Sequence, residues 1–129
     1  MVVGLGIDVA SIERIAGALE RFGDRIWQRL LTTGEQRDLS GRVADRATAL
    51  AGRFAAKEAA FKALGGPRDV GWRHLEVRRG ATGAPELVLH GPAEAHAARL
   101  GATRSHISIT HDAGVACSVV LLEHAEVPA

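Results

Sequence analysis

The chain has few of the residues that build disulfide scaffolds or aromatic stacking surfaces. Its 129 residues include one cysteine and no tyrosine, and aromatic residues make up only 4% of the sequence. The lone Cys117 cannot form an internal disulfide bond. No apolar run approaches the roughly 18 residues that a membrane span needs, and no basic leader precedes a short apolar stretch. We therefore expect a cytoplasmic enzyme or binding module.

An excess of one charge is also lacking. Sixteen Lys and Arg residues against fifteen Asp and Glu residues give a net charge of +1, which argues against a general nucleic-acid binder. Several common chemical motifs are absent as well: the zinc spacings HExxH and CxxC, the dinucleotide motif GxGxxG, the P-loop and the GxSxG elbow. With 47% hydrophobic residues and no repeat or linker, residues 1–129 are expected to form one domain around one core.

The first strand carries an unusual face. Residues 2–9 alternate in the manner of a half-buried strand, and Gly4, Gly6 and Asp8 share one of its two faces. The missing side chains of the two glycines allow another backbone or a ligand to approach closely. Asp8 lies at the end of this face, which is a layout typical of a site.

A stripe of arginines marks the helix that follows. Ser11 is its expected N-cap, the helix extends to about Leu31, and Gly23 is an expected break or bend. On a helical wheel its basic residues gather beside the apolar face: Arg14, Arg21, Arg25 and Arg29. This stripe is either a solvated surface or a docking site for an acidic partner. The docking interpretation assumes that the helix continues past Gly23.

The remaining pattern predicts an α+β fold. Thr32 and Glu35 have the spacing of a capping box at the start of a short helix. The longest helix is expected over residues 45–64 and is apolar nearly all round, as a buried helix is. The other expected elements are strands over 74–79 and 86–89, a helix from Pro92 to Gly101, and a hairpin of residues 106–110 and 115–122 joined by a turn at 111–114.

Beyond its first two residues, the longest helix carries four charged residues, and each needs a partner. Glu58 and Lys62 are four residues apart, so an intrahelical ion pair is the minimal explanation. Arg53 and Lys57 are one turn apart, which suits either a polyanion such as a diphosphate or an exposed pair without a ligand. Asp8 and Glu58 could together hold Mg²⁺ if the first strand meets this helix, and otherwise each is a salt-bridge partner.

The final hairpin offers a second candidate site. His106, Ser108 and Thr110 share one strand face, which is exposed either to solvent or to a ligand. His111 and Asp112 are either an acid/base pair or a turn with a capping Asp.

Three segments together carry a family resemblance. They are GLGIDV at 4–9 with IERI at 12–15, RFAAKEAAFKALG at 53–65, and HISITHD at 106–112. With this order and spacing the chain resembles the holo-acyl-carrier-protein synthases, the short bacterial group of 4′-phosphopantetheinyl transferases. The likeness spans nearly the whole chain, including Trp72 and the turn at Gly83 and Pro85.

The resemblance implies the transferase fold, with an antiparallel sheet packed on a long central helix. It implies transfer of 4′-phosphopantetheine from coenzyme A to a serine of apo acyl carrier protein in fatty acid biosynthesis, leaving adenosine 3′,5′-bisphosphate. It also implies Mg²⁺ and a homotrimer with active sites between neighbouring subunits. The alternatives are a transferase for a polyketide or peptide synthase carrier and a non-catalytic module that binds coenzyme A or a carrier protein.

The resemblance also assigns roles to residues. Asp8 and Glu58 match the metal ligands, and Glu58 is the first candidate for removing the serine proton, with His111 second. Lys62 could offset charge on the leaving phosphate or return a proton to it. The positions that match the coenzyme A site are Arg53, Phe54, Lys57, Lys62, Pro85, His106, Ser108, Thr110 and His111, and those that match the carrier-docking surface are Arg14, Arg21 and Arg25. Ala84 stands where many relatives have a basic residue, so one contact to coenzyme A is in doubt.

Overall fold

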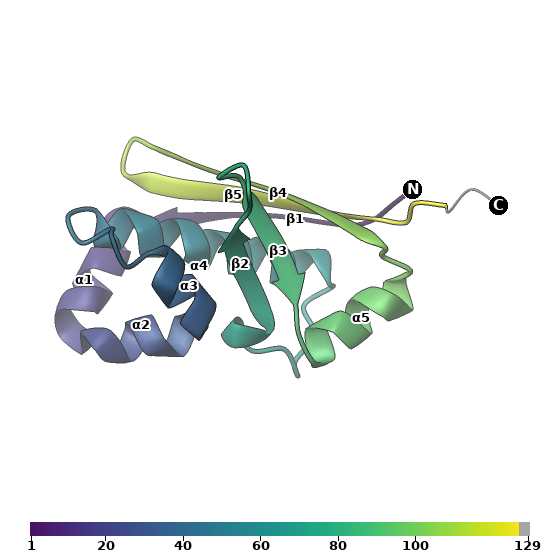
Figure 1. The fold of residues 1–129 in the computed structure, drawn as a ribbon, viewed down its shortest axis with the longest axis horizontal. Helices are drawn as coiled ribbons and strands as arrows, with labels where there is room; N and C mark the ends of the chain where they lie inside the picture. Colours follow the sequence, from purple (N-terminus) through teal and green to yellow (C-terminus); the bar gives the residue numbers. More distant parts are fainter. Residues whose placement is uncertain (127–129) are drawn as a thin grey trace.

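The computed structural model describes residues 1–126. The chain has an α+β fold (Figure 1). In chain order its elements are β1 (Val2–Ser11), α1 (Ile12–Phe22), α2 (Asp24–Leu30), α3 (Thr33–Asp38), α4 (Arg46–Ala63), the 3₁₀ turn η1 (Trp72–His74), β2 (Leu75–Arg79), β3 (Pro85–Leu89), α5 (Pro92–Leu100), β4 (Arg104–Asp112) and β5 (Val115–Glu123). Helices α1 to α4 thus follow one another between the first strand and the other strands. Within the described range, no helix is both long and apolar enough to cross a bilayer.

The three long strands form an antiparallel sheet in the order β1-β5-β4, and β2 and β3 form a separate hairpin. Figure 1 shows α4 and the other helices lying on one side of the long sheet. Most of α4 is buried between this sheet and the β2–β3 hairpin, as its apolar surface predicts. The predicted antiparallel sheet on a long central helix is therefore confirmed.

The glycine face of β1 makes the contact with α4. A Cβ atom on Gly6 would overlap the carbonyl oxygen of Ala59, and one on Gly4 would overlap that of Ala63. The approach of a second backbone, which was one of the two explanations for the paired glycines, is thus the one that the fold uses. It brings the first half of β1, up to Asp8, directly beside the last turns of α4.

The opposite face of β1 is apolar and exposed. The side chains of Leu5, Ile7 and Val9 are 62%, 60% and 59% exposed, and in β5 the neighbouring Val119 is 38% exposed. We call Leu5, Ile7, Val9 and Val119 the apolar sheet face. A contiguous exposed patch of this kind typically marks an interface with another molecule.

The predicted helix from Ser11 to Leu31 is two helices. Ser11 caps α1 as expected by accepting a hydrogen bond from the backbone N–H of Arg14. Gly23 then adopts φ +58° and ψ −137°, which ends α1 and redirects the chain into α2. The break expected at Gly23 is therefore confirmed. The arginine stripe is divided between two helices, so the assumption of one continuous helix, on which the docking interpretation depended, is wrong.

The last hairpin also differs from the expectation. His111 and Asp112 belong to β4 rather than to the turn, and the turn consists of Ala113 and Gly114. Both residues have positive φ, as a tight two-residue hairpin turn of the I′ type requires. Glycine adopts positive φ without strain, so Gly114 suits this turn. Alanine rarely has positive φ, so the conformation of Ala113 could not be predicted from its residue type.

Candidate active site

The packing of β1 against the last turns of α4 brings Asp8 and Lys62 together, although β1 continues past Asp8 to Ser11. The Nζ atom of Lys62 donates to Oδ1 of Asp8 at 2.9 Å and to the carbonyl oxygen of Ile7 at 3.1 Å. The expected ion pair between Lys62 and Glu58 is not formed within residues 1–126, because the ammonium reaches Asp8 instead. The strand and the helix do meet, which was the condition for a joint role of Asp8 and Glu58.

Glu58 lies in the same cluster. Burial raises the pKa of its carboxyl group, the negative charge of Asp8 raises it further, and Lys62 acts in the opposite direction. The cluster thus contains two carboxyl groups and one ammonium group, and the ammonium group pairs with Asp8.

This donor set fits the Mg²⁺ ion that the resemblance implies. Mg²⁺ prefers oxygen ligands and is usually bound by one or two carboxylates together with waters and substrate phosphates. The part of the chain that the structure describes has no group of three or more His, Cys, Asp or Glu side chains that could enclose a metal on its own. Asp8 and Glu58 therefore suit an ion shared with a substrate rather than a closed structural site.

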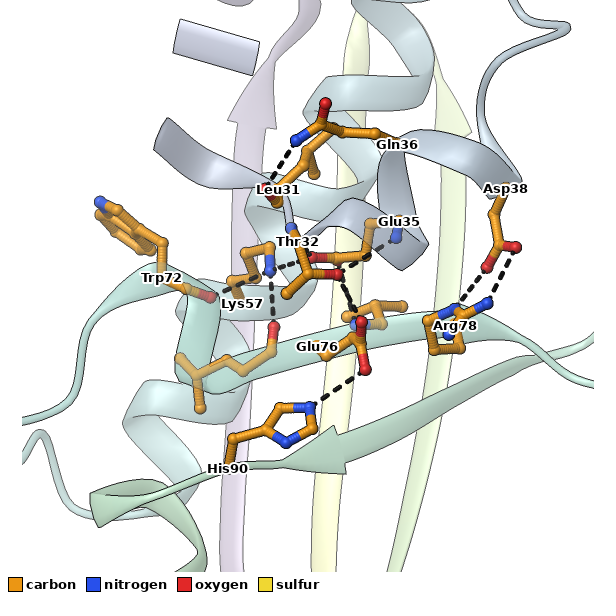
Figure 2. A network of polar contacts seen from close by, with 12 residues as sticks. Leu31, Thr32, Glu35, Gln36, Asp38, Lys57, Trp72, Glu76, Arg78 and His90 are labelled. Carbon is orange, nitrogen blue, oxygen red and sulfur yellow. Dashed lines mark hydrogen bonds and ion pairs between the residues drawn. The ribbon is translucent and has the colours of Figure 1, made fainter. Parts of the chain in front are cut away.

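Lys57 lies in a different place from the one expected (Figure 2). Its side chain is 0% exposed, and its Nζ atom donates to Oε1 of Glu35 at 2.7 Å and to the carbonyl oxygens of Trp72 at 3.0 Å and Leu75 at 2.6 Å. All three donors of the ammonium are used, and no surface is left for a ligand. The predicted contact of Lys57 with coenzyme A does not fit this geometry, so its role is structural.

Glu35 is the residue that sequence reasoning missed. Its Oε2 atom accepts from the backbone N–H of Val77, and its Oε1 atom accepts from the backbone N–H of Thr32 as well as from Lys57. Thr32 in turn donates to Glu76, which also contacts His90 (Figure 2). The capping-box spacing identified Glu35 as a helix cap, and that role is confirmed. Nothing in the spacing indicated that the same carboxylate would be buried against Lys57.

Arg53 lies one turn before Lys57 on α4. Burial lowers the pKa of its guanidinium group, and the charges of Glu35 and Asp38 partly oppose the shift. Its Nε atom is buried and has no hydrogen-bond partner among the described residues. Asp38 itself is paired with Arg78, which holds the pKa of that carboxyl group at about 2. Arg53 therefore has donor capacity that this chain leaves unused.

A groove of about 750 Å³ runs between β1, the first two helices and η1. Three arginines line it, namely Arg14, Arg25 and Arg29, together with the apolar side chains Phe22, Ile26, Phe54 and Trp72. The rings of Phe54 and Trp72 contact each other at a centroid distance of 5.4 Å. Arg21 is not part of the lining, and its guanidinium lies over the ring of Phe22.

Pro85 and His106 lie close together outside the groove. They line a second pocket, of about 460 Å³, between the start of β3 and β4. The side chains of His106, Ser108 and Thr110 are on the exposed face of β4, the same side of the sheet as the apolar sheet face. Within its own chain, His106 contacts Glu123 at 3.0 Å.

His111 lies toward the N-terminal end of α4. The pKa of Asp45, the residue before α4, is lowered by its hydrogen bonds from Arg42 and to a smaller degree by the charge of His111. The charges that act on Glu58 within the chain are those of Asp8 and Lys62. The chain thus places the two candidate bases, Glu58 and His111, in different surroundings.

The predicted coenzyme A residues consequently occupy several places on one chain. Lys62 is beside Asp8, Arg53 faces the β2 side of α4, Phe54 lines the groove, and Pro85 with His106 lines the second pocket. Within a single chain, the predicted coenzyme A residues therefore do not line one common cavity.

Comparison with known proteins gives the same family. The 4′-phosphopantetheinyl transferase superfamily matches residues 4–120. A holo-[acyl-carrier-protein] synthase of Nitratidesulfovibrio vulgaris is 50% identical over 125 residues, covering 95% of this chain and 99% of that protein.

Solved structures agree in fold. A holo-(acyl-carrier-protein) synthase from Bacillus anthracis, in complex with CoA (3′,5′-ADP), superimposes with a TM-score of 0.78 at 34% identity, covering 97% of this chain and 99% of that one. The holo-[acyl-carrier-protein] synthase of Helicobacter pylori in complex with coenzyme A gives the same TM-score at 29% identity, with coverages of 92% and 99%.

Proposed function

The chain belongs to the 4′-phosphopantetheinyl transferase superfamily, and from this premise we propose that it is a single-domain holo-acyl-carrier-protein synthase. It transfers 4′-phosphopantetheine from coenzyme A to a serine of apo acyl carrier protein in fatty acid biosynthesis. Adenosine 3′,5′-bisphosphate is the second product. We also propose that the reaction takes place in the cytoplasm.

One observation carries the catalytic assignment. Asp8, Glu58 and Lys62 form a charged cluster where β1 meets α4, although Asp8 and Lys62 are 54 residues apart in sequence. Two carboxylates and a lysine within one cluster are what a phosphoryl-transfer site needs to bind a cation and a phosphate side by side.

The reaction exchanges one P–O bond for another. The serine oxygen of the carrier attacks the phosphorus that bears the pantetheine, and the bond from this phosphorus to the adenosine 3′,5′-bisphosphate breaks. Glu58 accepts the serine proton, and burial makes it a stronger base by raising the pKa of its carboxyl group. His111, supplied from β4, is the second candidate for this step.

Asp8 and Glu58 would hold Mg²⁺, which when bound neutralises charge on the diphosphate of coenzyme A. Lys62 lies one turn after Glu58 and directs its ammonium at the phosphate that leaves, offsetting its charge or returning a proton to it. Arg53 remains a proposed charge-assisted contact to a phosphate through its guanidinium group, although the unpaired Nε atom is itself buried. Positioning and electrostatics thus provide most of the catalysis.

The groove beside α1 and α2 suits the carrier protein. Arg14 and Arg25 supply positive charge at its wall, and Phe54 with Trp72 supplies an apolar floor. Carrier proteins present an acidic helix beside the target serine, so charge and shape are complementary. Arg21 remains a proposed docking residue outside the groove itself.

Arg14→Glu is expected to raise the KM for the carrier protein by about tenfold or more at low salt, because electrostatic steering governs the association rate. The KM for coenzyme A should change less than twofold. Steady-state kinetics at several salt concentrations measure both, and the difference from wild type should shrink as salt rises. Arg68→Glu, an exposed arginine outside the groove, is the matched control. Equal changes in both KM values would contradict the docking assignment.

The assembly that we propose is a homotrimer with active sites between subunits. It is supported by the apolar sheet face, which needs a partner, and by the scattered coenzyme A residues, which a neighbouring chain could complete. His106, Ser108 and Thr110 lie on the same side of the sheet as this face. A neighbouring subunit packed on the apolar sheet face would therefore contact these three residues.

Ile7→Glu tests this assembly, because it places a charge in the middle of the apolar sheet face. Light scattering after gel filtration should give three times the 13.6 kDa chain mass for wild type and a lower mass for Ile7→Glu, together with loss of transfer. Leu100→Glu, which alters an exposed leucine at the end of α5, should leave mass and activity unchanged. A wild-type chain that is monomeric and fully active would contradict the proposal.

The transfer itself is tested by incubating the protein with coenzyme A, Mg²⁺ and an apo acyl carrier protein and weighing the intact carrier by mass spectrometry. The expected result is a mass gain of one phosphopantetheine, dependent on metal and absent with Asp8→Ala. A gain only on a polyketide or peptide synthase carrier would identify that transferase instead. No gain on several folded carriers would indicate a binding module.

A further inference from the structure

Lysine is rare in this chain, and its two lysines differ in how accessible they are. Only Lys57 and Lys62 are lysines among sixteen basic residues, and both belong to α4. Lys57 is buried with all its donors used, so Lys62 is the accessible lysine of the chain. Unlike arginine, lysine offers a compact point charge on a flexible stem, which can exchange one anionic partner for another.

The ammonium group of Lys62 lies on the carboxylate of Asp8, where the proposed function puts the divalent ion. Its Nζ atom is held by Oδ1 of Asp8 and by the carbonyl oxygen of Ile7, both within 3.1 Å. The side chain of Asp8 is 17% exposed and that of Lys62 is 52% exposed, so the lysine reaches in from the surface to a mostly buried carboxylate. A divalent ion on Asp8 would compete with the ammonium for the same carboxylate.

Charge balance favours replacement of the Lys62 ammonium by the divalent ion at Asp8 over binding of both there. Asp8 and Glu58 carry two negative charges in one cluster, and Lys62 compensates one of them. A divalent ion compensates both, which removes the electrostatic reason for the ammonium to stay on Asp8. Repulsion between the ammonium and a divalent ion a few ångströms away also opposes their coexistence.

We infer that Lys62 is an internal counter-ion that substitutes for the divalent ion in the free chain. Binding of the ion displaces it from Asp8 and makes it available to the phosphates of the substrate. The inference rests on the metal role of Asp8 and Glu58 in the proposed function. By linkage, the pairing of Lys62 with Asp8 and the binding of the ion weaken each other.

The first test measures Mn²⁺ affinity without coenzyme A, from the electron paramagnetic resonance signal of free Mn²⁺. Lys62→Met keeps the apolar stem and removes the charge, and it should tighten Mn²⁺ binding by about tenfold, since the ion no longer displaces a cation. Lys62→Arg keeps a charge that can pair with Asp8 and should remain near wild type. Arg46→Met, on the same helix and with the same change in net charge, removes a different exposed pair, with Asp24, and should change the affinity less than twofold.

The second test uses the shortage of lysines. An amine-reactive ester applied to the wild-type chain can label Lys62 and the N-terminal amine, and peptide mass spectrometry separates the two. Addition of Mg²⁺ should raise the labelling rate of Lys62 severalfold and leave that of the N-terminal amine unchanged. In Asp8→Asn, Lys62 should label rapidly with or without Mg²⁺.

Three results would overturn the inference: equal or weaker Mn²⁺ binding by Lys62→Met, equal tightening in Arg46→Met, or labelling of Lys62 that Mg²⁺ does not change. Absence of Mn²⁺ binding by both wild type and Lys62→Met would overturn the inference, whereas a metal site completed by the phosphates of coenzyme A is tested by the metal dependence of the transfer. The mass gain of the carrier is measured separately, so failure of the exchange and failure of the transferase function give different results.

Discussion

Asp8→Ala and Glu58→Ala are each expected to lower the rate of phosphopantetheine transfer by about a thousandfold or more. A bound metal ion contributes several kcal/mol of charge stabilisation to a transition state, and each 1.4 kcal/mol corresponds to a factor of ten in rate. Either substitution would remove one of the two carboxylates that we propose as ligands of that ion. Glu58→Ala also removes the first candidate for accepting the serine proton.

The fold should survive both substitutions. The pair of Asp8 with Lys62 is partly exposed, and such pairs contribute about 1 kcal/mol or less to stability. Circular dichroism and thermal unfolding check this, and transfer is measured by mass spectrometry at moderate Mg²⁺. Glu94→Ala, an exposed carboxylate on α5, is the control and should retain wild-type rates. A near-wild-type rate in either variant would remove that residue from the mechanism.

Lys57→Met is expected to lower the free energy of unfolding by about 3–5 kcal/mol. The substitution leaves the carboxylate of Glu35 buried without its cation, and breaking a buried pair at one partner carries a penalty of this size. It also removes the donor to the carbonyl oxygens of Trp72 and Leu75. Urea unfolding measures the loss, at one fixed protein concentration because the proposed assembly would make stability depend on concentration.

A second substitution separates the charge from the packing. In the Lys57→Met background, Glu35→Gln removes the unpaired charge while its amide oxygen can still accept from the backbone N–H of Val77. Part of the lost stability should therefore return. Arg46→Met breaks an exposed pair on the same helix and should cost about 1 kcal/mol or less. If Lys57→Met costs no more than Arg46→Met, the buried pair is not an important source of stability.

Much of the fold could be predicted because it depends on neighbours in sequence. Thr32 and Glu35 form the expected capping box, and Gly101 ends α5 with φ +80°. The predicted helix over 45–64 matches α4 to within one residue at each end. In these cases the deciding contacts are made within about one turn of helix, so residue spacing contains the information.

The functional cluster could be predicted only in part. The glycines of β1 indicated a close approach, and the charged residues of α4 indicated partners, but neither pattern says which partner is chosen. Lys62 pairs with Asp8 rather than with Glu58, and Lys57 turns inward to Glu35 while Arg53 keeps an unused donor. Each choice depends on elements that the chain brings together from distant positions.

The sequence by itself determined the elements, their caps and the chemical identity of the groups at the end of β1 and along α4. The tertiary structure alone decided which lysine is structural and which is accessible, and which face of β1 remains exposed. The physical reason is that helix and strand periodicity are set locally by the backbone. Burial and ion pairing are instead set by whichever surface packs against each side chain, and that surface comes from 22 residues away for Lys57 and 54 for Lys62.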